Sequence, residues 1–212
     1  MKVYFVRHGE TDWNKAGRLQ GRTDIPLNEN GRRVAELTRE GLKGVAFDTA
    51  FTSPLVRARE TAEIILEGRG IEIQDEERVI EVAFGKYEGA KKNEADENIE
   101  YFFRKPECYR AKDGLESIEE IFAREKAFLE ELFHDEKYKE STILVATHGA
   151  ALSGIICVLK GYEVKDFWKD GLHKNCGMTI VEVTDGKPTI LQQGIILYEE
   201  DAVANPTWVD KK

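Results

Sequence analysis

The chain has 212 residues, of which 41% are hydrophobic and 33% are charged, and its formal net charge is -9. A chain of this length can bury about 70% of its unfolded surface, which is enough for one substantial core. The acidic balance argues against general nucleic-acid binding, and no apolar run approaches the roughly 20 residues of a membrane span.

The first predicted element is a strand that ends in a polar triplet. Residues 3–6 are apolar without polar alternation, which indicates a strand covered on both faces of a parallel sheet. The triplet Arg7-His8-Gly9 follows at the carboxyl edge, where open α/β sheets bind ligands. Arg7 offers donors for phosphate or carboxylate, and His8 can act as a base or a nucleophile.

The next segments are predicted as a loop, a helix and a second strand. Residues 11–24 are rich in Gly, Asn, Arg and Thr and are typical of a loop over the sheet edge. Asn28 is a candidate N-cap for the following helix, in which Gly31 costs about 1 kcal/mol relative to alanine. A close approach to another element would explain this glycine. Residues 46–52 form the second strand candidate.

A second helix is predicted to start at Ser53-Pro54, with Ser53 as N-cap and Pro54 in the first turn. Arg57 and Arg59 fall in its opening turns. Because they are two residues apart they diverge around the helix, so we expect them to have different roles.

The middle of the chain contains short strand candidates and a charged excursion. Residues 71–73 and 79–80 could form strands, and residues 81–89 form a loop. Residues 90–113 are charged but rich in aromatics, too many for comfortable disorder. We therefore predict that they form a helical cap over the sheet edge. Ser117 then begins a long amphipathic helix with a capping box.

A second all-apolar strand is predicted over residues 142–146 and ends in Thr147-His148-Gly149. The helix expected over residues 150–159 directs its N-terminus and positive dipole end to the same edge. Residues 178–183 alternate like a strand, and Asp185-Gly186 is a turn signal for a hairpin.

These elements predict an α/β fold, a three-layer sandwich with a mostly parallel central sheet, helices on both faces and a small helical excursion over the active site. An antiparallel strand from the C-terminal hairpin is expected at its border. We expect a single domain over residues 1–212, with a cap at 90–113 and a tail at 199–212. Trp208 in the tail receives no role.

Four segments bring polar residues to this edge, and with their neighbours they resemble the histidine phosphatase superfamily, in the branch that contains the cofactor-dependent phosphoglycerate mutases and related phosphatases. The resemblance spans residue 7 to about 179. Any one motif is weak, but the set in this order is highly specific. The motifs are Arg7-His8-Gly9-Glu10-Thr11 with Asn14, residues 17–21, residues 24–27, residues 53–58, Glu81 with Gly85, Glu88-Gly89, Glu116-Ser117 with Arg124, and Thr147-His148-Gly149.

The resemblance implies roles for five catalytic residues. His8 would be the nucleophile that attacks phosphorus and becomes phosphohistidine, for which it must be neutral. Arg7, Arg57 and His148 would surround the equatorial oxygens of the phosphoryl group. Glu81 would protonate the departing alcohol and then activate water.

The resemblance also implies a set of phosphate- or substrate-binding residues. For Thr11 it implies a contact through the hydroxyl group. The other members of the set are Asn14, Gln20, Gly21 and Gly149.

Other polar residues and a metal site are the alternatives to these assignments. Glu88, seven residues after Glu81, is the rival acid, and the family pattern selects Glu81. His134 near a helix end is most simply a surface residue that compensates the helix dipole, and His173 receives no role. A metal site is a poor interpretation, because two arginines beside a divalent cation would repel it. We therefore expect no metal.

We favour a phosphomonoester hydrolase acting on a small phosphorylated metabolite, without a cofactor. The alternative is a phosphoglycerate mutase, for which 2,3-bisphosphoglycerate would serve as primer. The stretch from residue 89 to 114 is short for a mutase, although basic residues there could hold a substrate carboxylate: Arg104, Lys105, Arg110 and Lys112. A non-catalytic phospholigand or phosphoprotein binder is a third hypothesis.

The cellular context is also an expectation from the sequence. The three cysteines are widely spaced and fit neither a disulfide framework nor a zinc motif, and the N-terminus lacks a secretory signal pattern. We expect a cytoplasmic protein, a monomer or homodimer, that contacts neither membrane nor nucleic acid.

Overall fold

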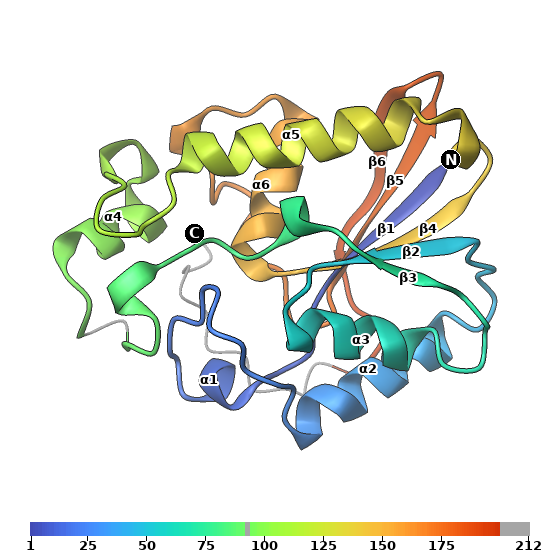
Figure 1. Cartoon of the computed structure of the whole chain (residues 1–212), viewed down its shortest axis with the longest axis horizontal. Helices are drawn as coiled ribbons and strands as arrows, with labels where there is room; N and C mark the ends of the chain where they lie inside the picture. Colours follow the sequence, from blue (N-terminus) through green and yellow to red (C-terminus); the bar gives the residue numbers. More distant parts are fainter. Residues whose placement is uncertain (92–93, 200–212) are drawn as a thin grey trace.

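The computed structural model describes residues 1–91 and 94–199. Its centre is a six-stranded sheet of order β3-β2-β4-β1-β5-β6 (Figure 1). The pairs β3-β2, β2-β4 and β4-β1 are parallel, and β5 and β6 continue the sheet antiparallel. The predicted mostly parallel sheet with an antiparallel border is confirmed. The strands are β1 (Lys2–Arg7), β2 (Thr49–Thr52), β3 (Ile73–Asp75), β4 (Thr142–Thr147), β5 (Met178–Thr184) and β6 (Lys187–Ile195).

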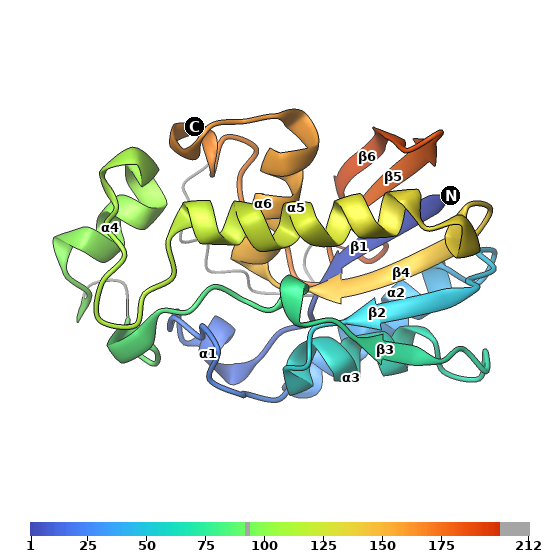
Figure 2. The same cartoon turned by 45° about the horizontal axis from the view of Figure 1, so that its top comes forward.

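Helices cover both faces of the sheet, as predicted. In the two views α2 and α3 lie on one side, and α5 and α6 lie on the other (Figure 2). Successive residues of β1 alternate between these layers: Tyr4 and Val6 join the core under α2 and α3, whereas Val3 and Phe5 join the core under α5 and α6. The helices are α1 (Asp12–Lys15), α2 (Glu29–Gly41), α3 (Val56–Ile65), α4 (Glu97–Arg104), α5 (Ile118–His134) and α6 (Gly149–Lys160).

Two of the three predicted helix caps are confirmed. Asn28 caps α2 by accepting from the backbone of Gly31 at 2.8 Å, and Ser117 forms the expected capping box of α5. The prediction for Ser53 was wrong, because α3 begins at Val56 with Leu55 as its N-cap. The Ser53 hydroxyl is directed to a histidine instead, as described below.

Gly31 makes the close approach that its presence in a helix suggested. A Cβ atom on Gly31 would lie 2.1 Å from the carbonyl oxygen of Glu10, and one on Gly9 would lie 2.7 Å from the carbonyl oxygen of Gly31. Backbone therefore packs directly on backbone where α2 crosses the segment that follows β1.

Several segments differ from the secondary structure predicted for them. Residues 77–79 form a 3-10 turn rather than the strand suggested at 79–80, and β3 and β2 are shifted or shortened relative to the predicted ranges. The predicted loop over residues 11–24 contains the short helix α1. The predicted tail at 199–212, including Trp208, lies outside the described residues from position 200 onward.

The excursion at 90–113 contains α4 and a 3-10 turn at Pro106–Cys108. Phe102 is fully buried at its centre, with its ring 5.2 Å from that of Phe84 and 5.6 Å from that of Trp168. The indole nitrogen of Trp168 donates to the Phe102 carbonyl at 2.7 Å. Aromatic side chains therefore form the core of the excursion, in line with the ordered cap predicted from its aromatic content.

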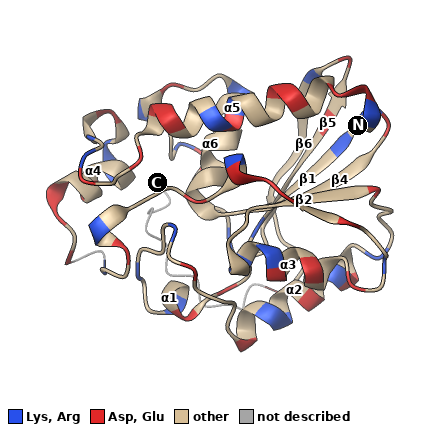
Figure 3. Ribbon diagram, viewed as in Figure 1, with Lys and Arg blue, Asp and Glu red and all other residues tan. Residues whose placement is uncertain are grey.

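Charged residues of both signs are mixed along α2, α3 and α5 (Figure 3). None of these helices presents a run of basic residues of the kind that binds nucleic-acid backbones. Within residues 1–91 and 94–199, no helix combines the length and apolar character that crossing a bilayer requires.

Candidate active site

Three strands end at one edge of the sheet and deliver neighbouring polar residues there. His8 follows β1, Ser53 follows β2 and His148 follows β4. A pocket opens at this edge. Seven of the ten predicted site residues line it: Arg7, His8, Asn14, Gln20, Gly21, Glu81 and Gly149.

His8 is a buried, neutral imidazole with a defined tautomer. Its Nδ1 lies 2.6 Å from the carbonyl oxygen of Gly9, which can only accept, so the ring proton is on Nδ1. Burial and the positive charges of Arg57 and Arg7 hold the pKa of His8 well below its ordinary value. Nε2 therefore keeps a free lone pair, as a nucleophile requires.

His148 lies beside His8, with 5.2 Å between the ring centroids. It is fully buried, and its Nε2 is 2.7 Å from the hydroxyl oxygen of Ser53. Burial and the charge of Arg57 hold the pKa of His148 well below its ordinary value. Two neutral histidines therefore lie side by side among buried arginines.

Three buried nitrogen atoms in this cluster have no hydrogen-bond partner among the described residues: Arg7 Nε, Arg57 Nε and His148 Nδ1. The rest of each guanidinium is tied down by backbone. Arg7 donates to the carbonyl of His173, and Arg57 donates to the carbonyls of Gly21 at 2.6 Å and Thr23 at 2.9 Å.

Burial lowers the pKa of Arg57 to about 10, so it remains charged at neutral pH. Unpartnered buried nitrogen atoms are rare in proteins, and a group of them carried by two arginines and a histidine is suited to the oxygens of an anion. Arg59, by contrast, pairs with Asp75 and Glu63 at the surface, as expected for a solvated residue.

Glu81 lies against the N-terminus of α6. Its carboxylate accepts from the backbone nitrogens of Gly149 at 3.1 Å, Ala150 at 3.3 Å and Ala151 at 3.0 Å, and from Val82 at 3.0 Å. The Gly149 N–H, expected to bind phosphate, here donates to Glu81. The positive end of the helix thus holds a carboxylate at the pocket wall.

Glu88, the rival acid, has a structural role in the folded protein. Its carboxylate accepts from the backbone nitrogens of Arg22 at 3.0 Å and Phe84 at 3.1 Å, and from the hydroxyl of Thr23. A Cβ atom on Gly21, which has a φ of +54°, would lie 2.2 Å from this carboxylate. Glu88 therefore braces the loop that carries Gly21.

The predicted phosphate-binding loop is linked internally through Thr11. The Thr11 hydroxyl lies 2.8 Å from Gln20 Oε1, and it accepts from the backbone of Asn14 at 3.1 Å. Thr11 is fully buried, whereas Asn14 and Gln20 line the pocket. The structure thus brings Asn14 and Gln20 to the pocket, with Thr11 behind them.

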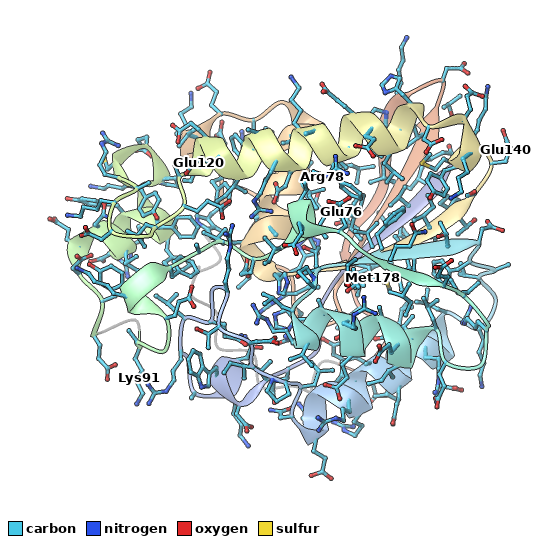
Figure 4. All side chains as sticks on the ribbon, viewed as in Figure 1. Glu76, Arg78, Lys91, Glu120, Glu140 and Met178 are labelled. Carbon is cyan, nitrogen blue, oxygen red and sulfur yellow. The ribbon has the colours of Figure 1, made fainter. Side chains whose placement is uncertain are left out.

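The segment that carries Glu81 is anchored to α5 by ion pairs. Arg124 bonds Glu116 at 2.8 Å and donates to the Arg78 carbonyl at 2.6 Å. Arg78 and Glu76 lie next to each other near α5 (Figure 4) and pair at 2.7 Å, and Arg78 also reaches Glu131 at 2.7 Å. These contacts explain why Glu116 and Arg124 belong to the motif set without reaching the pocket.

One supporting segment was missed by the sequence analysis. Asn175 is buried and donates to the carbonyl oxygen of His8 at 3.0 Å, and the backbone nitrogen of Cys176 donates to the carbonyl of Arg7 at 3.0 Å. His173, which had no assigned role, supplies the carbonyl that holds Arg7. Most of these contacts use backbone atoms, so residue types gave no signal.

Beyond the anion-binding end, the pocket wall is largely apolar. Phe84, Phe103, Trp168 and Leu172 line it, and Arg18 is a further basic side chain of the lining. The basic residues considered for a substrate carboxylate do not line this pocket: Arg104, Lys105, Arg110 and Lys112. Across the described part of the chain, no group of three or more His, Cys, Asp and Glu side chains is arranged to hold a metal ion.

Comparisons with known proteins identify relatives across this whole arrangement. Residues 3–195, which include every residue that lines the pocket, match the family model of the histidine phosphatase superfamily (branch 1). Phosphoserine phosphatase 1 of Hydrogenobacter thermophilus is 31% identical over 201 residues, covering 93% of this chain and 94% of that protein.

Two further relatives extend the comparison. A Photorhabdus laumondii protein named "Probable phosphoglycerate mutase GpmB" is 35% identical, covering 86% of this chain and 85% of its own. The solved structure of Bacillus stearothermophilus YhfR superposes with a TM-score of 0.86 at 30% identity, covering 92% of this chain and 97% of YhfR.

Proposed function

The chain belongs to branch 1 of the histidine phosphatase superfamily, and we therefore propose that it is a metal-independent phosphomonoester hydrolase that acts through a phosphohistidine on His8. The observation that supports this most strongly is a neutral His8 with a free Nε2 among the unpartnered nitrogens of Arg7, Arg57 and His148. Such donors suit the equatorial oxygens of a phosphoryl group under attack.

In the first half-reaction, His8 Nε2 attacks phosphorus in line and the ester P–O bond breaks. The electron pair of that bond goes to the alcohol oxygen, which takes a proton from Glu81, and Glu81 enters this step in its protonated form. Arg7, Arg57 and His148 hold the three equatorial oxygens while charge redistributes. The products are phosphohistidine, the free alcohol and the Glu81 carboxylate.

In the second half-reaction, the Glu81 carboxylate takes a proton from water as the water oxygen attacks the phosphohistidine. The P–N bond breaks, its electron pair returns to His8 Nε2, and inorganic phosphate leaves. Glu81 is again protonated and His8 again neutral, so the cycle closes without a cofactor.

For the substrate, we propose a small phosphorylated metabolite whose alcohol part carries a carboxylate. Relatives named for phosphoserine and for phosphoglycerate support this class. Arg18 lines the pocket with one guanidinium nitrogen donating to the Gly89 carbonyl, and its positive charge suits such a carboxylate. The wall of Phe84 and Trp168 suits a short carbon skeleton. The mutase alternative is less favoured, because the basic residues of the cap do not line the pocket.

Phosphorus NMR tests the reaction and its alternative together. The protein is incubated with phosphoserine, 3-phosphoglycerate and nitrophenyl phosphate, each with and without catalytic 2,3-bisphosphoglycerate. We expect inorganic phosphate in the absence of the bisphosphate. Formation of 2-phosphoglycerate faster than phosphate would make the protein a mutase, and no turnover of any ester would leave it a binding protein.

Arg18→Gln tests the substrate class. We expect it to raise KM about tenfold for phosphoserine or 3-phosphoglycerate, since it removes one charge-assisted contact. It should leave nitrophenyl phosphate, which has no carboxylate, nearly unchanged. Equal losses on both kinds of ester would remove Arg18 from substrate recognition.

We further propose a cytoplasmic location, supported by three free cysteines, of which Cys157 and Cys176 are buried. The oligomeric state, monomer or homodimer, stays a prediction that sedimentation analysis can decide. Independence from metal also stays a prediction, and full activity after treatment with a chelator would support it.

A further inference from the structure

Ser53 is a buried hydroxyl residue with no role in the chemistry described above. It follows β2, and its Oγ lies 2.7 Å from His148 Nε2 and 3.3 Å from the backbone nitrogen of Leu55. Both Ser53 and His148 are 0% exposed, so bulk water does not compete for these contacts. The pair joins two strand ends that are 95 residues apart in the sequence.

The proton positions in this pair follow from counting donors and acceptors. The Leu55 N–H donates to Ser53 Oγ, which leaves the hydroxyl proton to be donated, and His148 Nε2 is the acceptor in reach. In the opposite arrangement, with a proton on Nε2, the Ser53 hydroxyl proton would have no acceptor among residues 1–91 and 94–199. A buried donor without a partner costs about 1–3 kcal/mol.

The other ring nitrogen leads to the same assignment. His148 Nδ1 is buried and unpartnered in the described structure, beside His8 and the two arginines. A neutral ring with its proton on Nε2 would present a lone pair from Nδ1 to the phosphoryl oxygens, which are themselves acceptors. A ring with its proton on Nδ1 would instead donate to them.

We propose that Ser53 is a positioning residue that donates to His148 Nε2 and thereby keeps the proton of the neutral His148 ring on Nδ1, where it is donated to the transferring phosphoryl group. The last step rests on the proposed function. The tautomer itself does not, because it is fixed by contacts within the free protein.

Nitrogen NMR of the free protein measures the tautomer directly. With ¹⁵N-labelled histidine, long-range ¹H–¹⁵N spectra distinguish protonated from unprotonated ring nitrogens, and the chain has only four histidines to assign. We expect His148 to carry its proton on Nδ1 and to lose this preference in Ser53→Ala. Inorganic phosphate should shift the His148 Nδ1–H signal.

Single-turnover kinetics measures the consequence. Ser53→Ala should slow phosphoenzyme formation about tenfold, as expected for the loss of one orienting hydrogen bond. Ser153→Ala is the matched control, because the Ser153 hydroxyl lies near the start of α6 but donates to the Gly149 carbonyl at 3.1 Å instead of His148. Its kcat and the His148 spectrum should stay unchanged.

Amide replacements of His148 separate its two nitrogens. The amide nitrogen of Asn can occupy the place of Nδ1, whereas that of Gln reaches the place of Nε2. We expect His148→Asn to keep more activity than His148→Gln, and Ser53→Ala to have little further effect once His148 is Asn.

A wild-type spectrum with the His148 proton on Nε2 would overturn the proposal, as would a Ser53→Ala variant with unchanged tautomer and rate. If Ser53→Ala does not fold, the wild-type spectrum and Ser53→Cys, which keeps a weak donor, decide the question. A protein with the expected tautomer that hydrolyses no ester would support the Ser53 assignment and refute the hydrolase.

Discussion

At the scale of single residues, backbone atoms hold the two groups that are proposed to react, His8 and Glu81. The Gly9 carbonyl fixes the proton of His8, and the amides of α6 hold the carboxylate of Glu81. Because these partners are backbone atoms, conservative replacements such as Glu81→Gln should remove one proposed chemical step with little change in the surrounding geometry.

His8→Ala should lower turnover of every substrate by roughly ten-thousand-fold or more, since the nucleophile is lost. The fold should remain, as circular dichroism and thermal melting would show. His134→Ala, at an exposed position on α5, is the matched control and should keep full activity. Appreciable turnover by His8→Ala would exclude the phosphohistidine mechanism.

Glu81→Gln should affect substrates according to their leaving groups. A general acid contributes about 10²–10⁴-fold when the leaving alcohol is a poor one. We expect losses of that order for alkyl phosphates and much smaller losses in phosphoenzyme formation for nitrophenyl phosphate, whose leaving group departs unprotonated. Equal losses in this step would show that Glu81 acts by another route, such as holding the N-terminus of α6.

At the scale of elements, the contact between α5 and α6 contains an unusual buried acid. Glu125 of α5 is fully buried, and neither of its carboxyl oxygens has a hydrogen-bond partner in the described structure. It lies against Gly154 of α6, where a Cβ atom would come within 2.2 Å of its carboxyl group. Arg124 is 3.7 Å away, too far for a good hydrogen bond.

Burial raises the pKa of Glu125 well above its ordinary value, against the lowering effect of Arg124 and with smaller raising effects from Glu116 and Glu81. Cys157 of α6 also interacts with Glu125, and burial raises the pKa of Cys157 to about 12. The folded protein therefore keeps a proton on Glu125 that the unfolded chain releases above about pH 4.5.

This acid predicts a pH dependence of stability. The contribution of Glu125 to the free energy of unfolding should fall as the pH rises from about 4.5 toward its folded pKa, by up to about 1.4 kcal/mol per pH unit. It opposes the contribution of the buried histidines described below, so urea titrations at several pH values should show a stability that rises more steeply with pH in Glu125→Gln than in the wild type. Glu130→Gln, on the exposed side of α5, should follow the wild type. The same pH dependence in Glu125→Gln and the wild type would contradict the assignment.

The elements also show what the sequence can and cannot predict. The apolar strands that end at His8 and His148, the caps at Asn28 and Ser117 and the C-terminal hairpin all follow local patterns, and these were predicted correctly. The contacts of Ser53 with His148 and of the His173 carbonyl with Arg7 join distant segments, often through backbone. Local propensity predicts a helix cap at Ser53, because a local pattern carries no information about a hydrogen-bond partner 95 residues away.

At the scale of the whole molecule, three buried histidines make the fold sensitive to acid. Burial lowers the pKa of His8, His148 and His173, the last to about 4. The unfolded chain takes up protons at these residues below about pH 6.5, whereas the folded protein does not. Their contribution to stability is thus complete above pH 6.5 and is lost as the pH falls toward the folded pKa values.

His173→Gln should reduce this loss measurably, because it leaves the backbone carbonyl in place and removes one titrating ring. Between pH 6.5 and 4, the free energy of unfolding should drop by about 3 kcal/mol less than in the wild type. His134→Gln, at an exposed position, should lose the same free energy of unfolding between pH 6.5 and 4 as the wild type. Equal losses in His173→Gln and the wild type would contradict the assignment.

The backbone contact between Gly9 and Gly31 has a consequence for how this family member can vary. Gly31 lies in a helix and takes no part in the proposed reaction, yet a single methyl group there would collide with the carbonyl of Glu10. Neither rotamer change nor repacking can relieve a collision with main-chain atoms. In a saturation scan of α2, Gly31 should therefore tolerate as few replacements as His8 itself, and a survey of tolerance alone would mistake this packing constraint for a place in the chemistry.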